Sequence, residues 1–118
     1  MQDFIADAWP AMAHAAGLDD FESIWQQDIG WFEEPNQRRG GWSGVSRLEV
    51  ELPDGSHTAV FIKRQLNHVT RTWRYPFRGI TTFRREFENL QRLQAAGVPT
   101  LDVLYFAERE ARDERRAI

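Results

Sequence analysis

The sequence predicts an α+β fold in which an antiparallel sheet of about five strands packs on one helix, preceded by short N-terminal helices. Residues 47–52 alternate charged and apolar side chains, which is typical of a half-buried strand. Pro53-Asp54-Gly55 then turns the chain into an apolar strand over 58–63, so the two strands form a hairpin. Residues 82–96 instead repeat apolar side chains at helical spacing, which predicts one packed helix.

Length and composition limit the chain to one globular domain. It has 118 residues, of which 42% are hydrophobic, and a formal net charge of −3. The lack of cysteine excludes disulfides, thiolate metal sites and a cysteine nucleophile. The three histidines, His14, His57 and His68, lack ligand spacing, so no metal site is predicted. The first residues have neither a basic segment nor a long apolar run, and a cytoplasmic location is expected.

Residues 1–36 are predicted to be an N-terminal helical extension of short helices and turns. Pro10 suits a first helical turn and Gly17 suits a C-cap. Asp19 with Glu22 three residues later resembles a capping box that opens a second helix. The larger aromatic side chains of this region are expected to be packing anchors of the core: Trp9, Trp25, Trp31 and Phe32.

Residues 37–44 form a glycine-rich segment ahead of the first strand. Gly40, Gly41, Ser43 and Gly44 fall within it. Because glycine has no side chain, such a turn lets backbone N–H groups approach a phosphate closely. Plain turn geometry is the alternative explanation for these glycines.

Lys63 ends the second strand of the hairpin and is the only lysine, since the other 14 of the 15 basic residues are arginine. An ammonium is a compact point charge suited to phosphate or carboxylate oxygens in a narrow space, unlike the planar guanidinium. The alternative is a lysine that extends from a strand end into solvent.

Glu86 lies within the apolar face of the predicted helix, between positions occupied by Phe83, Phe87, Leu90 and Leu93. A carboxylate there needs a cation or hydrogen-bond donors. Lys63 can supply the cation, which predicts a partly buried Lys63–Glu86 pair. Alternatively, Glu86 lies at the rim of the face and pairs with arginine or water.

The segment that follows Lys63 is basic and rich in aromatic residues. Residues 55–85 carry +7 and no acidic residue, whereas the remainder carries −10. Arg71, Arg74 and Arg78 alternate with aromatic residues in an irregular stretch over 64–82. This pattern predicts an anionic partner, such as a lipid headgroup, a phosphorylated sugar or a nucleic-acid backbone. A solvated loop whose aromatic side chains pack on the core is the alternative.

The end of the chain is predicted to return to strands. Gly97 closes the helix, and Val98-Pro99 favours extended backbone. A strand is expected over 101–106, a charged turn over 108–114 and the beginning of another strand over 115–118.

The order of these elements resembles the small lobe of protein-kinase-like phosphotransferases, with Val60-Phe61-Ile62-Lys63 as the lysine strand and Glu86 as the helix glutamate. More narrowly, the chain resembles the lipopolysaccharide core kinases of the Kdo/WaaP group, especially InaA-type members. The segments that carry this likeness are Arg39 to Val45, Phe61 to Gln65, Asn67-His68, Thr81 to Phe83, Arg85 to Phe87 and Ala96 to Pro99.

The resemblance implies transfer of the ATP γ-phosphoryl group, with Mg²⁺, to a sugar of the lipopolysaccharide inner core at the cytoplasmic side of a Gram-negative inner membrane. It assigns catalytic roles to Lys63 and Glu86. It assigns cofactor binding to Lys63, Gly40, Gly41, Ser43 and Gly44.

The resemblance also implies that residues 1–118 are a single incomplete domain, with the small lobe over 37–118 and the second lobe absent. The catalytic base and metal ligands of such enzymes belong to that second lobe, so the chain is not expected to be active alone. Two departures from the kinase pattern stand out. Arg39 replaces the first glycine, and Phe61 replaces the small residue that borders adenine.

Two other functions fit parts of the sequence. A non-catalytic module for nucleotide or anionic lipid would use the same glycines, lysine and arginines. A nucleic-acid binder would use residues 64–82, but the negative overall charge disfavours it.

Overall fold

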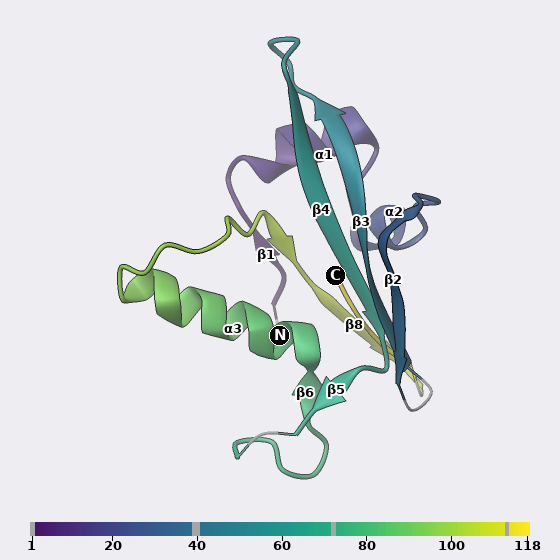
Figure 1. Ribbon diagram of the computed structural model, residues 1–118, viewed down its shortest axis with the longest axis vertical. Coiled ribbons are helices and arrows are strands. Elements are labelled where there is room, and N and C mark those ends of the chain that lie inside the picture. The colour runs from purple at the N-terminus through teal and green to yellow at the C-terminus, as the bar shows by residue number, and fades with distance from the viewer. Residues whose placement is uncertain (1, 39–40, 72, 113) are drawn as a thin grey trace.

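The computed structural model describes residues 2–38, 41–71, 73–112 and 114–118. Figure 1 shows a long twisted sheet with a helix, α3, beside it and two shorter helices, α1 and α2, behind it. The helices are α1 (Trp9–Ala16), α2 (Phe21–Trp25) and α3 (Thr82–Ala95). The strands are β1 (Phe4–Ile5), β2 (Trp31–Arg38), β3 (Gly41–Glu51), β4 (His57–Leu66), β5 (Val69–Thr70), β6 (Ile80–Thr81), β7 (Tyr105–Phe106), β8 (Glu108–Ala111) and β9 (Glu114–Ala117).

The main sheet has five antiparallel strands in the order β2-β3-β4-β9-β8, which confirms the predicted α+β fold. β3 and β4 form its longest ladder, from Trp42 opposite Leu66 to Glu51 opposite His57. The turn that the sequence predicts at Pro53-Asp54-Gly55 joins these two strands into a hairpin. Gly55 adopts a φ of 84°, and the Asp54 carboxylate accepts a 2.9 Å hydrogen bond from the Ser56 N–H.

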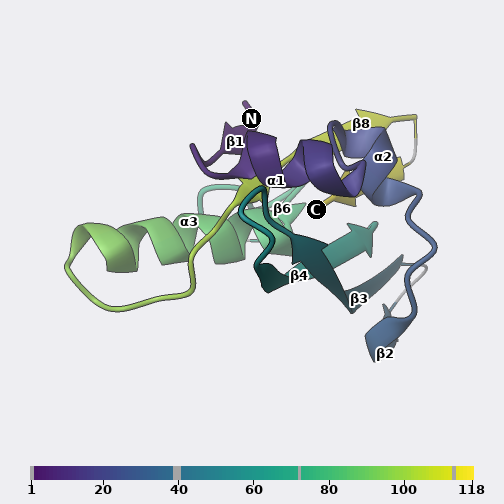
Figure 2. The same cartoon turned by 90° about the horizontal axis from the view of Figure 1, so that it is seen from above.

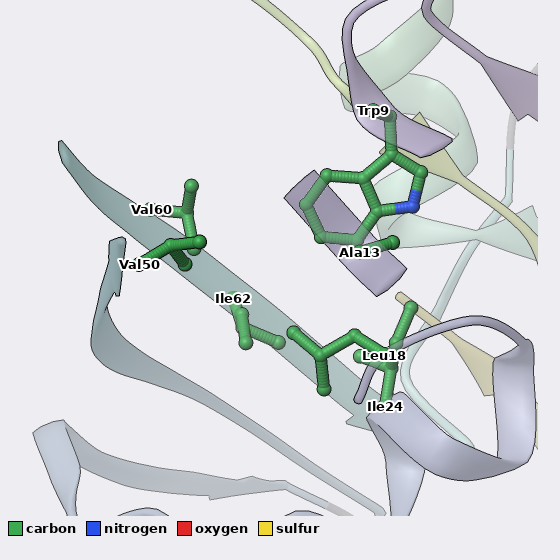
Figure 3. Packing of buried hydrophobic residues seen from close by; sticks show 7 residues of the cluster. All are labelled: Trp9, Ala13, Leu18, Ile24, Val50, Val60 and Ile62. Carbon is green, nitrogen blue, oxygen red and sulfur yellow. The ribbon is translucent and has the colours of Figure 1, made fainter. Parts of the chain in front are cut away.

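The main core lies between one face of β3 and β4 and the two N-terminal helices. Figure 2 shows α1 and α2 covering this face, with α3 to the side. Apolar residues alternate along each strand so that they point toward these helices. The buried cluster, drawn in Figure 3, consists of Trp9, Ala13, Leu18, Ile24, Val50, Val60 and Ile62. The opposite face of β4 is not covered by α1 and α2.

Arg64 is a buried cation within this side of the sheet, with 5% of its surface exposed. Its Nη1 donates to the backbone oxygens of Trp25 at 3.1 Å and Gln27 at 2.8 Å, and its Nη2 donates to Ser46 Oγ at 3.1 Å. The guanidinium also lies 4.7 Å from the centre of the Trp31 ring. Burial lowers the pKa of Arg64 from its usual value. These contacts join the end of α2 to β3 and β4.

Two arginine–carboxylate pairs hold the N-terminal region against the hairpin formed by β8 and β9. Arg109 donates to both oxygens of Asp3 at 2.8 Å. The hydrogen bond from Arg109 lowers the pKa of Asp3. Arg116 contacts Glu22 in α2, with 2.7 Å between Nη2 and Oε1.

α3 begins and ends close to the predicted positions, and a second cluster holds it in place. The N-cap is Thr81, whose Oγ1 accepts a 3.1 Å hydrogen bond from the Arg84 N–H. Phe87 is buried and stacks on Phe106 with 4.6 Å between ring centres.

None of the helices in the described ranges is both long and apolar enough to cross a membrane.

The N-terminal region departs from the prediction in three respects. Its helices end at Trp25, and residues 31–36 belong to β2 instead of a helical extension. The cap of α2 is Asp20, not Asp19, and its carboxylate accepts from the Ser23 N–H at 2.7 Å. Trp9 is a core anchor as predicted, but Phe32 is 59% exposed. The alternation in β2 turns Phe32 away from the face that α2 covers.

The C-terminal region also differs from the prediction. Only Tyr105 and Phe106 of the expected 101–106 strand pair with another strand, β1. The expected charged turn over 108–114 is mostly β8, which forms a hairpin with β9. The irregular stretch over 64–82 is partly ordered too, because β4 continues to Leu66 and β5 pairs with β6. β7 pairs with β1, which is distant in sequence, and the sequence gives no local signal for that pairing. β8 and β9 are joined by a short turn, and their many charged residues do not show the alternation typical of a half-buried strand.

Candidate functional site

Lys63 lies on the face of β4 that α1 and α2 do not cover. Its neighbours Ile62 and Arg64 are buried on the other face, with 6% and 5% of their surface exposed. Because successive strand side chains point to opposite faces, Lys63 and Phe61 must point away from the main core. The ladder places Val45 of β3 directly opposite Lys63.

Glu86 reaches Lys63 from α3, so the predicted ion pair is present. Lys63 Nζ lies 2.7 Å from Glu86 Oε1 and 5.9 Å from the centre of the Phe83 ring. Each side chain of the pair is 44% exposed, which is more than the sequence predicts. The exposure leaves the ammonium accessible to a ligand. It also reduces the stability that the pair can contribute, because water screens the attraction.

Gln65 positions α3 relative to β4. It is fully buried and stands two residues after Lys63, on the same face of the strand. Its Oε1 accepts a 2.7 Å hydrogen bond from the Phe83 N–H in the first turn of α3, and its Nε2 donates to the His68 backbone oxygen at 2.5 Å. Glu86 follows Phe83 by about one helical turn. Gln65 thus fixes the helix where its glutamate meets Lys63.

Gln65 is a site residue that sequence reasoning missed. A glutamine within a strand, on the same side as the lysine, was the available signal, because a buried amide needs specific partners. The partners themselves lie 3 and 18 residues further along the chain, so the sequence does not identify them.

A groove of about 540 Å³ runs between β4, α3 and residues 101–106. Both Lys63 and Glu86 line it, and most of the remaining lining is apolar, including Phe61, Phe83 and Leu90. In the described part of the chain, β9 pairs with β4 only at Gln65 and Leu66. The groove therefore follows the stretch of β4 that β9 does not cover. Besides the ion pair, its polar lining residues are Thr58, Asp102 and Tyr105.

The glycines ahead of Lys63 lie in the β2–β3 hairpin, and Gly40 falls outside the described residues. A Cβ at Gly41 would lie 2.5 Å from the Leu66 backbone oxygen, and one at Gly44 would lie 2.6 Å from the Trp31 ring. Both positions therefore need glycine for contacts within the protein. The expected turn over 37–44 is wrong for these two residues, because both belong to strand β3 and neither has a positive φ.

Ser43 is better placed for a role beside Lys63. It is half-buried in β3 and pairs with Gln65, so it shares the lysine's face of the sheet. Lys63 is the diagonal neighbour of Ser43 across the ladder, and such neighbours are about 7–8 Å apart. Its cofactor role stays a prediction.

Phe61 and Phe32 form an exposed aromatic pair on the same face. Their ring centres are 5.3 Å apart in an edge-to-face arrangement, and their exposed fractions are 57% and 59%. Phe61 occupies the place of the small residue in the kinase pattern, so an adenine on this face would have to contact the pair. The contribution of Phe32 was missed because its strand was not predicted.

Arg71 and Arg74 are exposed and form no ion pair within the part of the chain that the structure describes. Arg78 differs, because its guanidinium pairs with Glu110 of β8. The lack of an acidic residue over 55–85 therefore does not leave Arg78 unpaired. Glu110 is distant in sequence, and only the fold brings it there.

Among the residues described, no group of three or more His, Cys, Asp or Glu side chains could hold a metal ion. The Lys63–Glu86 pair fits a phosphate group, because the ammonium is accessible and held from one side. The space that a Cβ would take at Gly41 and at Gly44 is filled by protein, and the cofactor-binding role of these glycines stays a prediction.

A five-stranded antiparallel sheet, a lysine on its central strand and a helix glutamate bound to that lysine define the small lobe of a protein-kinase-like fold. Comparison with known families agrees. Residues 22–118 match the lipopolysaccharide kinase (Kdo/WaaP) family, and the chain belongs to that family.

The chain is similar to the protein InaA of Escherichia coli (strain K12). The two are 34% identical over 107 residues, which cover 91% of this chain and 47% of InaA. The chain thus spans about half the length of this relative. No solved structure matches the chain.

Proposed function

We propose that this chain is the ATP-binding small lobe of a kinase that phosphorylates a sugar hydroxyl of the lipopolysaccharide inner core. The observation that carries the proposal is the accessible Lys63–Glu86 pair, 2.7 Å across, in a chain of the Kdo/WaaP family. In protein-kinase-like folds such a lysine contacts nucleotide phosphates while the helix glutamate holds it in place.

The geometry supports this division of roles. An ammonium has three N–H donors, and Glu86 Oε1 accepts from one of them. The others are available for phosphate oxygens on the open side of the sheet. Gln65 keeps α3, and with it Glu86, at the distance this arrangement needs. Lys63 is thus held in position before a ligand arrives, which lowers the cost of binding.

Kinases use ATP and Mg²⁺, and the metal neutralises charge on the phosphates when bound. No described residue is assigned as a metal ligand or as the base that accepts the proton of the sugar hydroxyl. We therefore propose that this chain alone binds nucleotide without transferring phosphate. The location proposed for the whole enzyme is the cytoplasmic face of a Gram-negative inner membrane, where the lipopolysaccharide core is within reach.

Nucleotide titration followed by NMR tests the proposal. ATP with Mg²⁺ should shift the amide signals of Ser43, Lys63 and Glu86 and leave those of α1 unchanged. Because one lobe leaves half of the nucleotide in water, the dissociation constant should be about 1 mM, equivalent to about −4 kcal/mol. Lys63→Met should abolish the shifts, whereas Arg92→Gln, a charge change in the last turn of α3, should preserve them.

Two results would contradict the proposal. Shifts that persist in Lys63→Met would show that the nucleotide binds elsewhere. Transfer of labelled γ-phosphate to core oligosaccharide by the purified 118-residue chain would show that a base lies among residues described here as structural.

A further inference from the structure

The segment between β5 and β6, described over residues 71 and 73–79, exposes two large aromatic side chains almost completely. Trp73 is 95% exposed and Phe77 is 88% exposed. Figure 1 shows this segment extending beyond β5 and β6, away from the sheet and from α3. Side chains of this size normally lose much of their surface to neighbours, so their exposure needs an explanation.

The segment is anchored at its base. Arg84 of α3 contacts Tyr75, with 3.3 Å from Nη2 to the hydroxyl oxygen and 5.3 Å from the guanidinium to the ring centre. Arg115 donates to the backbone oxygens of Arg78 and Gly79 at 3.2 and 3.3 Å.

Gly79 makes the close return of this segment possible. Its φ is 71°, and a Cβ there would lie 2.9 Å from the Thr70 backbone oxygen. A larger residue would therefore separate the two ends of the segment. Trp73 and Phe77 are thus presented to solvent from a fixed base.

The charge around these aromatic residues is positive. Arg71 and Arg74 are exposed, and no acidic residue occurs anywhere between Gly55 and Arg85. Arg78 already pairs with Glu110, so the first two arginines supply the charge that is open to a partner. Two exposed aromatic side chains, Trp73 and Phe77, with arginines beside them in the sequence suit the boundary between lipid headgroups and acyl chains. Aromatic rings and cations are both favoured at that boundary.

We infer that the described residues between β5 and β6, 71 and 73–79, dock this lobe onto an anionic bilayer surface. Trp73 and Phe77 enter the boundary between headgroups and acyl chains, and Arg71 and Arg74 bind lipid phosphates. This role is separate from the proposed nucleotide site, because it uses neither Lys63 nor Glu86. Each arginine should strengthen binding about fivefold, and the two aromatic residues together by at least about tenfold.

Vesicle co-sedimentation of the 118-residue chain tests the inference. The chain should bind phosphatidylcholine vesicles that contain phosphatidylglycerol, bind pure phosphatidylcholine weakly, and dissociate as salt rises. The double variants Trp73→Ser/Phe77→Ser and Arg71→Gln/Arg74→Gln should each lose binding by the factors above. Matched controls are Leu101→Ser, an apolar residue that is 75% exposed elsewhere, and Arg85→Gln/Arg92→Gln on α3. Both controls should bind as the native chain does.

A second measurement reports insertion directly. Brominated acyl chains should quench part of the tryptophan emission of the bound native chain, and Trp73→Phe should remove that part while it retains binding. Each variant is expected to fold, because the substituted side chains are exposed. Thermal melts check this expectation. Equal vesicle binding by native chain and both double variants would overturn the inference. Salt-sensitive binding of a single-stranded RNA oligonucleotide that excludes vesicles would also overturn it, in favour of nucleic acid.

Discussion

The Lys63–Glu86 pair allows a quantitative test of whether the interaction serves stability or ligand binding. The perturbation is a double-mutant cycle with Lys63→Met, Glu86→Leu and the combined variant. A fully buried pair would lose roughly 3–5 kcal/mol when one partner is removed. Here each side chain is 44% exposed, so the charge that remains after one substitution is still hydrated. The structure therefore predicts a coupling energy of about 0.2–1 kcal/mol.

Urea unfolding followed by circular dichroism measures the coupling as the departure of the double variant from additivity. The same four chains are then titrated with ATP and Mg²⁺. Unfolding free energies should differ by at most about 1 kcal/mol, whereas nucleotide binding should disappear in Lys63→Met and weaken in Glu86→Leu. A control cycle on Arg84 and Glu88, a half-buried i,i+4 pair within α3 whose side chains are 23% and 27% exposed, should leave nucleotide binding unchanged.

A coupling energy above about 3 kcal/mol would refute the reasoning, because it would require a pair shielded from water. Unchanged nucleotide binding in Lys63→Met, with a small coupling energy, would show instead that the pair has neither role.

Three further predictions concern the parts of the fold that position the site. Arg64→Met should lower the free energy of unfolding by roughly 2–4 kcal/mol, because it leaves two backbone oxygens and a hydroxyl without their buried donor; a near-neutral result in urea unfolding would contradict this. Asp3→Asn should cost about 1 kcal/mol at neutral pH by removing the two contacts with Arg109. Since the pKa of Asp3 is lowered in the folded state, its contribution is complete above about pH 4 and is lost as pH falls through the folded pKa, so native and variant stabilities should converge in acid; a constant difference down to low pH would argue against the pair. Gly44→Ala should cost about 1–3 kcal/mol by forcing a methyl group against the Trp31 ring, and Trp31→Leu in the same chain should recover part of the loss, whereas simple additivity in thermal melts would contradict the contact.

Much of the fold could be predicted because its signals are local. The alternation over 47–52, the turn at Pro53-Asp54-Gly55 and the helical spacing over 82–95 each depend on neighbours within a few residues. The candidate pair could be predicted for a related reason. Glu86 is a carboxylate on an apolar helical face and requires a cation or hydrogen-bond donors, and the single lysine, Lys63, could supply the cation.

The exposure of residues was harder to predict than their secondary structure. Phe32 was expected in the core and lies at the surface, whereas Arg64 was assigned to an irregular basic stretch and is buried in strand β4. Side-chain chemistry favours the opposite assignment in each case. Arg64 is buried because the end of α2 offers it backbone oxygens, and that contact spans 37 and 39 residues of sequence.

The sequence by itself thus determined the family, the main hairpin, the long helix and the two charged residues that the fold joins. Only the tertiary structure decided that the pair is half exposed, that Gln65 holds α3 in place, that Arg78 is neutralised by Glu110, and that Trp73 and Phe77 face solvent. The physical reason is the sequence separation over which each kind of interaction acts. Period and turn chemistry act between residues close in the chain, whereas burial and ion pairing depend on which distant segments pack together.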